Sequence, residues 1–140
     1  MHISKSFHDL QLGDTASIGK TVTEADILLF TAVSTDTNPV HLDEEAASRS
    51  HFGHRIAHGM LSAGLISAVL GTKLPGEGTI YVSQSLHFRH PVRIGDTVTA
   101  TVTVTGLEAD RLRVRLSTVC TVAGRTVIEG EAVVMPPRQP

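Results

Sequence analysis

The feature that most constrains this chain is residues 58–71, HGMLSAGLISAVLG, which would be apolar around almost the whole circumference of a helix. A helix without a polar face is a buried helix. Its small residues favour close packing against a broad surface such as a β-sheet. One helical face would carry Gly59, Ala63, Ile66, Ser67 and Leu70, while Leu61, Leu65, Ala68 and Val69 cover much of the remainder.

The covering surface is predicted from the second half of the chain, where the hydrophobic period changes to two. We expect strands over residues 79–92, 97–105, 112–120 and 125–135, with hairpin chemistry at Ala123-Gly124. A short strand over 14–22 and a helix over 24–33, capped by Thr23, precede the buried helix. This order predicts an α+β layout, in which one buried helix is wrapped by an antiparallel sheet.

Composition narrows the class of protein. The chain has 140 residues, which fits a single domain spanning 1–140, and a formal net charge of -2 that gives no general attraction to nucleic acid. Its one cysteine, Cys120, excludes an internal disulfide and fits a reducing compartment. The start of the chain lacks an apolar run typical of a signal peptide, and no stretch suits a membrane span. We therefore expect a cytoplasmic protein.

A loop ahead of the buried helix, STDTNPVHLDEEAA over residues 34–47, carries the first candidate chemistry. Asp36 stands five residues before His41, and Asn38-Pro39 between them marks a turn. A carboxylate and an imidazole are suited to proton transfer near neutral pH. The spacing alone is common, and in the simpler interpretation Asp36 caps a turn while His41 begins a helix.

The start of the buried helix is the second candidate. The first N–H groups of a helix lack internal partners and carry partial positive charge. Gly59 would let a ligand approach them closely, so that a carbonyl oxygen placed there would be polarised. The alternative is that Gly59 only permits tight packing between helix and sheet, and the residue itself does not decide between the two.

Other patterns are weaker. His51, His54 and His58 have spacings compatible with one helical face, but Gly53 interrupts them, so a zinc site is not expected. Serine nucleophile chemistry is disfavoured because no G-x-S-x-G is present. Several arginines alternate along strands and fit a solvated face, although one or two could meet phosphates of a nucleotide-bearing substrate; they are Arg89, Arg93, Arg111, Arg113 and Arg115.

In combination these residues resemble a known family. The D-T-N-P-V-H run at Asp36–His41, RIAHGMLSAGLISAVLG at 55–71 and the stretch 74–104 are similar to MaoC-like (R)-specific 2-enoyl-CoA hydratases of the hydratase 2 type. The likeness is to short single-domain enzymes that feed polyhydroxyalkanoate synthesis. It covers nearly the whole chain. One departure is Thr35, where many members have glycine before the acid.

The resemblance implies a hot-dog fold, a long helix wrapped by a curved antiparallel sheet, and a homodimer with its substrate tunnel at the subunit interface. It implies a hydro-lyase of fatty acid metabolism in which Asp36 and His41 activate water and the Gly59 N–H polarises the thioester carbonyl. It makes Asn38 a loop support and substrate-binding position. Acyl-pocket candidates are Ser67, Leu70 and Val133. No metal or separate cofactor is implied, because coenzyme A is part of the substrate.

The sequence leaves three other functions open. One is a 3-hydroxyacyl-thioester dehydratase acting on acyl carrier protein. Another is a hot-dog acyl-CoA thioesterase, which also uses an acid and a helix N-terminus but releases a free thiol. The last is a non-enzymatic partner subunit that only binds acyl chains, for which Asp36 and His41 would have no purpose.

Overall fold

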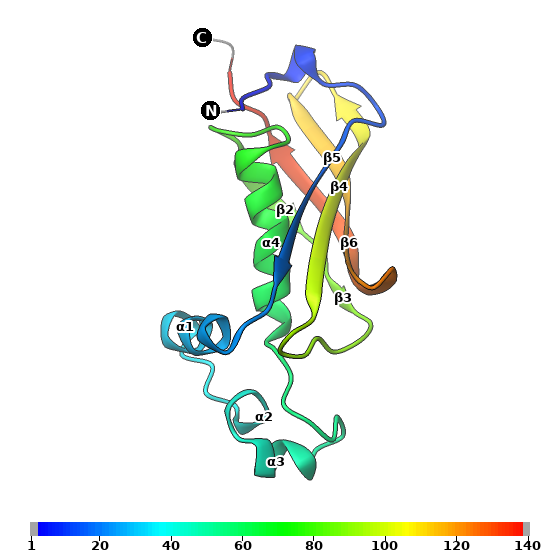
Figure 1. Ribbon diagram of the computed structural model, residues 1–140. Helices are drawn as coiled ribbons and strands as arrows, with labels where there is room; N and C mark the ends of the chain where they lie inside the picture. The colour runs from blue at the N-terminus through cyan, green and yellow to red at the C-terminus, as the bar shows by residue number, and fades with distance from the viewer. Residues whose placement is uncertain (1–2, 139–140) are drawn as a thin grey trace.

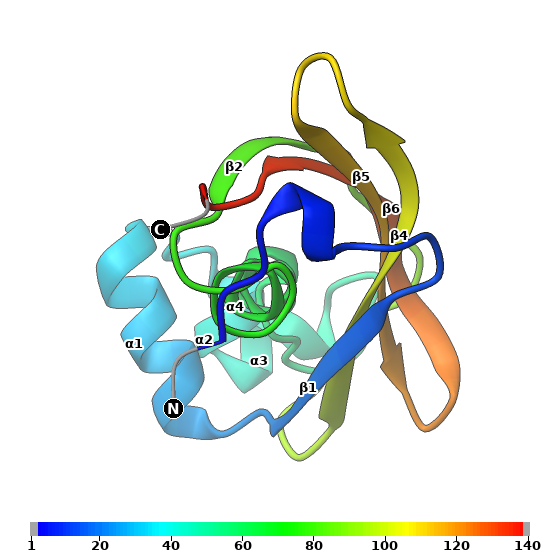
Figure 2. The same ribbon diagram turned by 90° about the horizontal axis from the view of Figure 1, so that it is seen from above.

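The computed structural model describes residues 3–138, and its centre is the helix α4, Gly59–Thr72 (Figure 1). The helix packs against β4, β1 and β5, and in the end-on view of Figure 2 the sheet curves around it. Ile66, Val69 and Leu70 are almost fully buried in this contact. The predicted buried helix is therefore confirmed.

One six-stranded antiparallel sheet forms the wrapping layer. Its strands are β1 (Thr15–Thr21), β2 (Ile80–Gln84), β3 (His87–Phe88), β4 (Thr97–Glu108), β5 (Arg113–Val122) and β6 (Arg125–Met135). The order across the sheet is β1-β4-β5-β6-β2, and β3 also pairs with β6. The wrapped helix and curved sheet are the hot-dog arrangement, which confirms the predicted fold class.

The alternation of side chains explains which face of the sheet meets the helix. Val98, Ala100, Val102 and Val104 of β4 are buried, with threonines between them on the other face. On β5 the buried side chains are Val114, Leu116, Thr118 and Cys120. The β5–β6 turn lies where it was predicted, and both of its residues have positive φ, 49° at Ala123 and 79° at Gly124.

Two strand predictions are wrong in detail. The single strand expected over 79–92 is instead two short strands, β2 and β3, and residues 89–92 are not in a strand. At the break the backbones lie close together, since a Cβ on Gly130 of β6 would lie 1.8 Å from the carbonyl oxygen of Ser85. Leu112, expected to begin the strand over 112–120, is 45% exposed with φ 51°, because it belongs to the β4–β5 turn.

Short helices gather at one end of α4 (Figure 1). The first, α1 (Glu24–Ser34), begins at Thr23, whose hydroxyl accepts from the Asp26 N–H in a capping box, as predicted. Two short helices follow the Asp36 loop, α2 (Pro39–Leu42) and α3 (Glu44–Ser48). Asp43 divides them, because its carboxylate accepts from the Glu45 and Ala46 N–H groups and starts a new helix. Among residues 3–138 no helix combines the length and apolar character needed to cross a membrane.

Candidate active site

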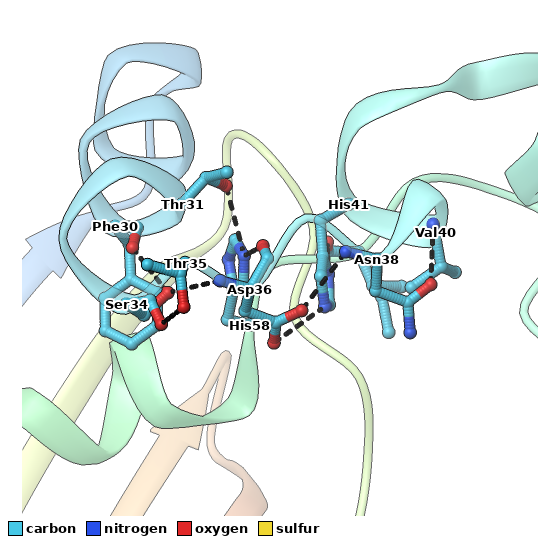
Figure 3. Close-up of polar contacts among 10 residues, drawn as sticks. Phe30, Thr31, Ser34, Thr35, Asp36, Asn38, Val40, His41 and His58 are labelled. Carbon is cyan, nitrogen blue, oxygen red and sulfur yellow. Dashed lines mark hydrogen bonds and ion pairs between the residues drawn. The ribbon is translucent and has the colours of Figure 1, made fainter.

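The loop between α1 and α2 holds Asp36 by its own hydrogen bonds (Figure 3). The Asp36 N–H donates to Ser34 Oγ at 3.1 Å, and Asp36 Oδ1 accepts from the Asn38 N–H at 3.2 Å. Asn38 caps α2 by accepting from the Val40 N–H at 3.2 Å, with Pro39 in the first turn. Thr35 has the left-handed φ of 64°, which explains why glycine would suit this position.

His41 is the buried member of the predicted acid–base pair, 7% exposed on α2. Its Nδ1 lies 2.8 Å from the carbonyl oxygen of Ile56. A carbonyl only accepts, so Nδ1 carries the proton and Nε2 of the neutral ring keeps its lone pair. Nε2 lies 3.9 Å from Asp36 Oδ2, a separation that one bridging water would fit.

Arg55 holds the backbone of His41 through a hydrogen bond. Its Nε donates to the His41 carbonyl oxygen at 2.9 Å, and its Nη2 contacts Glu24 Oε1 of α1 at 2.9 Å. The Ile56 N–H donates to the Val40 carbonyl at 3.2 Å. The segment entering α4 is therefore hydrogen-bonded along the helix that carries the imidazole.

His58, the N-cap residue of α4, lies against both predicted residues and is 2% exposed. Its ring stacks on that of His41 with centroids 3.8 Å apart and an interplanar angle of 27°. Its Nε2 lies 3.1 Å from the Asp36 carbonyl oxygen and 3.2 Å from Thr31 Oγ1 (Figure 3). Burial lowers the pKa of His58, and the nearby His41 acts in the same direction.

An apolar pocket of about 460 Å³ opens beside this group. Asp36, His58 and Gly59 contribute to its wall, together with Phe30 and Phe88. Gly59 is the first residue of α4, and a Cβ there would lie 2.5 Å from the Phe88 ring. The glycine therefore keeps the helix end open toward the pocket, so the approach of a ligand and the packing of Phe88 both explain it.

The donor atoms of Asp36, His41 and His58 all lie within 4.8 Å of one another, which raises the question of a metal. The two rings are stacked on each other, and His58 Nε2 donates to a backbone carbonyl, so this nitrogen has no lone pair to offer a metal. The arrangement suits proton transfer better than metal ligation. Of the three histidines whose spacing fits one helical face, only His58 belongs to this group; His51 and His54 do not.

The structure distributes the remaining predicted residues unevenly. Ser67 lines a second pocket that adjoins the first at Met60 and includes Tyr81. Leu70 is 1% exposed in the core, and Val133 lies within β6 opposite Ser83 of β2; neither lines these two pockets. Asn38 supports the loop from outside them.

Two groups that contact the predicted pair could not be identified from the sequence, the His58 ring and the Ile56 carbonyl. The His58 ring left no clear sequence signal, because its side chain makes no cap hydrogen bond to α4 and instead contacts Asp36 and His41. The Ile56 carbonyl left no sequence signal, because any residue supplies a backbone oxygen.

Fold and site together define a hot-dog protein with a carboxylate and an imidazole close to a helix N-terminus. The MaoC-like domain model matches residues 13–129, so the chain belongs to the MaoC-like family. An "(R)-specific enoyl-CoA hydratase" from Rhodospirillum rubrum is 63% identical over 131 residues, 94% of this chain and 91% of that protein.

Solved structures agree with this assignment. The unliganded R-hydratase PhaJ1 from Pseudomonas aeruginosa superimposes with a TM-score of 0.92 at 42% identity, covering 99% of this chain and 90% of that one. The (R)-hydratase from A. caviae involved in PHA biosynthesis gives 0.88 at 44% identity, covering 91% and 98%. Both share the fold described above.

The Gly59 geometry generates a prediction. In Gly59→Ala the new methyl group displaces the Phe88 ring into the pocket, so we expect turnover of an enoyl thioester to fall about tenfold or more. The free energy of unfolding should change by less than about 1 kcal/mol, because a half-exposed ring can move. Initial rates and urea melts measure the two effects.

Gly71→Ala is the matched control, since no atom lies within 4 Å of a Cβ there and the residue is on the same helix. It should stabilise the fold by roughly 0.5–1 kcal/mol and leave turnover unchanged. Equal activity of the two variants would contradict the role given to the helix end.

Proposed function

We propose that this chain catalyses the (R)-specific hydration of trans-2-enoyl-CoA to (R)-3-hydroxyacyl-CoA, and the reverse dehydration. The observation that carries the proposal is His41 Nε2, the ring nitrogen not bonded to the Ile56 carbonyl, facing Asp36 Oδ2 across 3.9 Å, beside an apolar pocket and the start of α4. The names of the similar proteins, two of them (R)-specific enoyl-CoA hydratases, support the same reaction. The enzyme is then a hydro-lyase.

Water is the first reactant to be placed. A molecule between His41 and Asp36 would donate one hydrogen bond to Nε2 and one to the carboxylate, which leaves an oxygen lone pair free for attack. His41 then accepts a proton as the oxygen bonds to C3, because its tautomer has the lone pair on that side. Asp36 orients the water and offsets the charge that forms on the imidazole.

The thioester carbonyl is the second group that the site must bind, at the start of α4. As the C3–O bond forms, the electron pair of the double bond moves through C2 to the carbonyl oxygen. The Gly59 N–H at the start of α4 would stabilise that oxyanion. The His41 imidazolium returns its proton to C2, which restores the carbonyl and the neutral ring. One water is added and no electron is gained or lost, so the reaction needs no redox cofactor.

The acyl chain is assigned to the adjoining pockets. Both are lined mainly by apolar side chains, and Ser67 of α4 contributes to the second. Among the residues expected to set chain length we place Ser67 in direct contact with the acyl chain. Leu70 and Val133 would act through packing behind it, since one lies in the core and the other in β6.

A homodimer is proposed from the exposed apolar surface around β2, the strand at the edge of the sheet. Ile80, Tyr81 and Val82 are exposed there, and Met60 of α4 is 54% exposed beside them. A second copy over this face would bury them and enclose the pocket that contains Ser67. We place the dimer in the cytoplasm, where the free thiol of Cys120 stays reduced.

The dimer predicts a mass in solution. Analytical ultracentrifugation of the wild-type chain should give twice the chain mass, and Val82→Asp should shift the equilibrium toward monomer because it places a charge in the apolar face. Ser17→Asp on β1, at the opposite edge of the sheet, is the control and should remain dimeric. A monomeric wild type would rule the proposal out.

The acid–base pair predicts a loss of activity. Asp36→Asn and His41→Gln should each lower the hydration of crotonyl-CoA by roughly 10²–10⁴-fold, because each removes a proton-transfer or orienting group. Loss of absorbance of the conjugated thioester follows the reaction, and chiral analysis should give the (R)-3-hydroxy product. His54→Gln, an exposed histidine outside the pocket lining, should retain wild-type turnover.

The same assay separates hydration from thioester cleavage. A thioesterase releases coenzyme A, which a thiol-reactive dye detects. Cys120 contributes no background in the folded protein, because burial raises the pKa of its thiol to about 11. Stoichiometric thiol release without a 3-hydroxy product, or full activity of Asp36→Asn, would overturn the hydratase assignment.

A further inference from the structure

We propose that His58 is a positioning residue for this reaction: a neutral imidazole that ties the Asp36 backbone to the start of α4 and supports the His41 ring from one face. The inference rests on the proposed hydratase function. It concerns the only histidine that contacts both members of the pair within the described residues.

The hydrogen bonds of His58 determine its tautomer. Its Nε2 lies 3.1 Å from the Asp36 carbonyl oxygen, which can only accept, so Nε2 carries the proton. Thr31 Oγ1, at 3.2 Å, is a second acceptor for the same N–H. His58 therefore joins α1, the Asp36 loop and α4 through one donor, as Figure 3 shows.

Its surroundings keep the ring uncharged. Nδ1 is buried and has no hydrogen-bond partner among the described residues, so a proton added there would bring an unsolvated charge. The ring is flanked by Phe30 of α1 at 4.8 Å and by His41 of α2. Burial is the main cause of its lowered pKa and His41 adds to it, while the carbonyl and carboxylate of Asp36 act in the opposite direction.

A neutral His58 serves the chemistry of His41 in two ways. When His41 takes the proton from water, the face next to it holds no second positive charge, so the imidazolium can form. The residue after His58 is Gly59, the proposed oxyanion donor. The bond from His58 to the Asp36 carbonyl therefore fixes the distance between the water-binding loop and the helix end.

Two substitutions test the positioning role. Gln retains an N–H donor at about the reach of the histidine Nε2 and carries no charge, whereas Leu fills the space without a donor. In crotonyl-CoA hydration we expect His58→Leu to lower kcat about 10- to 100-fold with KM changed less than about threefold, because orientation rather than binding is lost. His58→Gln should recover most of that kcat.

The pH profile separates positioning from direct proton transfer. If His58 only positions other groups, the plot of kcat against pH for His58→Gln should keep both its acidic and its basic limb, with a maximum equal to or below that of wild type. Wild-type kcat in His58→Leu, or a limb missing from His58→Gln together with an equal loss in both variants, would overturn the proposal.

The pH dependence of the melting temperature tests the neutral state of His58 without an activity assay. Because the pKa of His58 is lowered in the folded state, protons bind the unfolded chain more readily, and the stability contributed by the neutral ring is lost as the pH falls below about 6.5. The melting temperature of His58→Gln should therefore fall less than that of wild type between about pH 7 and pH 5. His8→Gln, an exposed histidine on the 3₁₀ turn Phe7–Asp9, is the control and should follow wild type.

These measurements distinguish failure of the proposed hydratase function from failure of the positioning role of His58. If the wild type does not hydrate crotonyl-CoA, the proposed function is wrong, but the melting comparison still tests whether His58 is held neutral. If the wild type is active and His58→Gln melts with the same or a steeper pH dependence, His58 is not held neutral and the positioning proposal is wrong.

Discussion

The site depends on the hydrogen bond from His41 Nδ1 to the Ile56 carbonyl, 2.8 Å long and buried. A free imidazole can present either nitrogen, and this bond leaves Nε2 unprotonated and directed at Asp36. The bond is held in place by a second link between the same segments, from the Ile56 N–H to the Val40 carbonyl. His58 then adds the bond to the Asp36 carbonyl. The loop and the segment entering α4 therefore form one unit.

The fold explains why that segment is available. The sheet curves around α4, and the N-terminal end of the helix lies on the side of the molecule where α2 and α3 are found (Figure 1). The Ala57 N–H bonds to the Val92 carbonyl at 2.7 Å, which anchors the entry to α4 beside the start of β4. Residues 56–59 thus supply the carbonyl that orients His41, the ring that supports it and the N–H proposed for the oxyanion. Backbone hydrogen bonds from this segment to Val40 and Val92 hold it in place, which suits positioning of this kind.

Much of the fold could be predicted from the sequence because the pattern is local. The apolar residues of α4 and the strict alternation from Thr97 to Thr105 each allow one secondary structure. The division of residues 79–92 could not be predicted, because it depends on how two short segments pair with β6, which is distant in the sequence. The boundary between α2 and α3 depends in the same way on backbone geometry, through the cap that the Asp43 carboxylate forms.

The candidate site divides in the same way. Asp36, His41 and Gly59 could be named because the runs that contain them together resemble a known family, although neither the spacing of the pair nor the glycine decides a role alone. The role of His58 depends on a stacked geometry that no spacing encodes, and Leu70 was assigned to the acyl pocket although α4 turns it into the core. Contacts across the fold decide which face of a helix meets a ligand.

The central claim is that the two stacked histidines hold opposite tautomers, and imidazole nitrogen NMR of ¹⁵N-histidine-labelled protein tests it most directly. At a pH where both rings are neutral, His41 should carry its proton on Nδ1 and His58 on Nε2, with His41→Gln and His58→Gln used for assignment. A His41 ring protonated on Nε2 would contradict the account, because it would present a proton rather than a lone pair to the water beside Asp36.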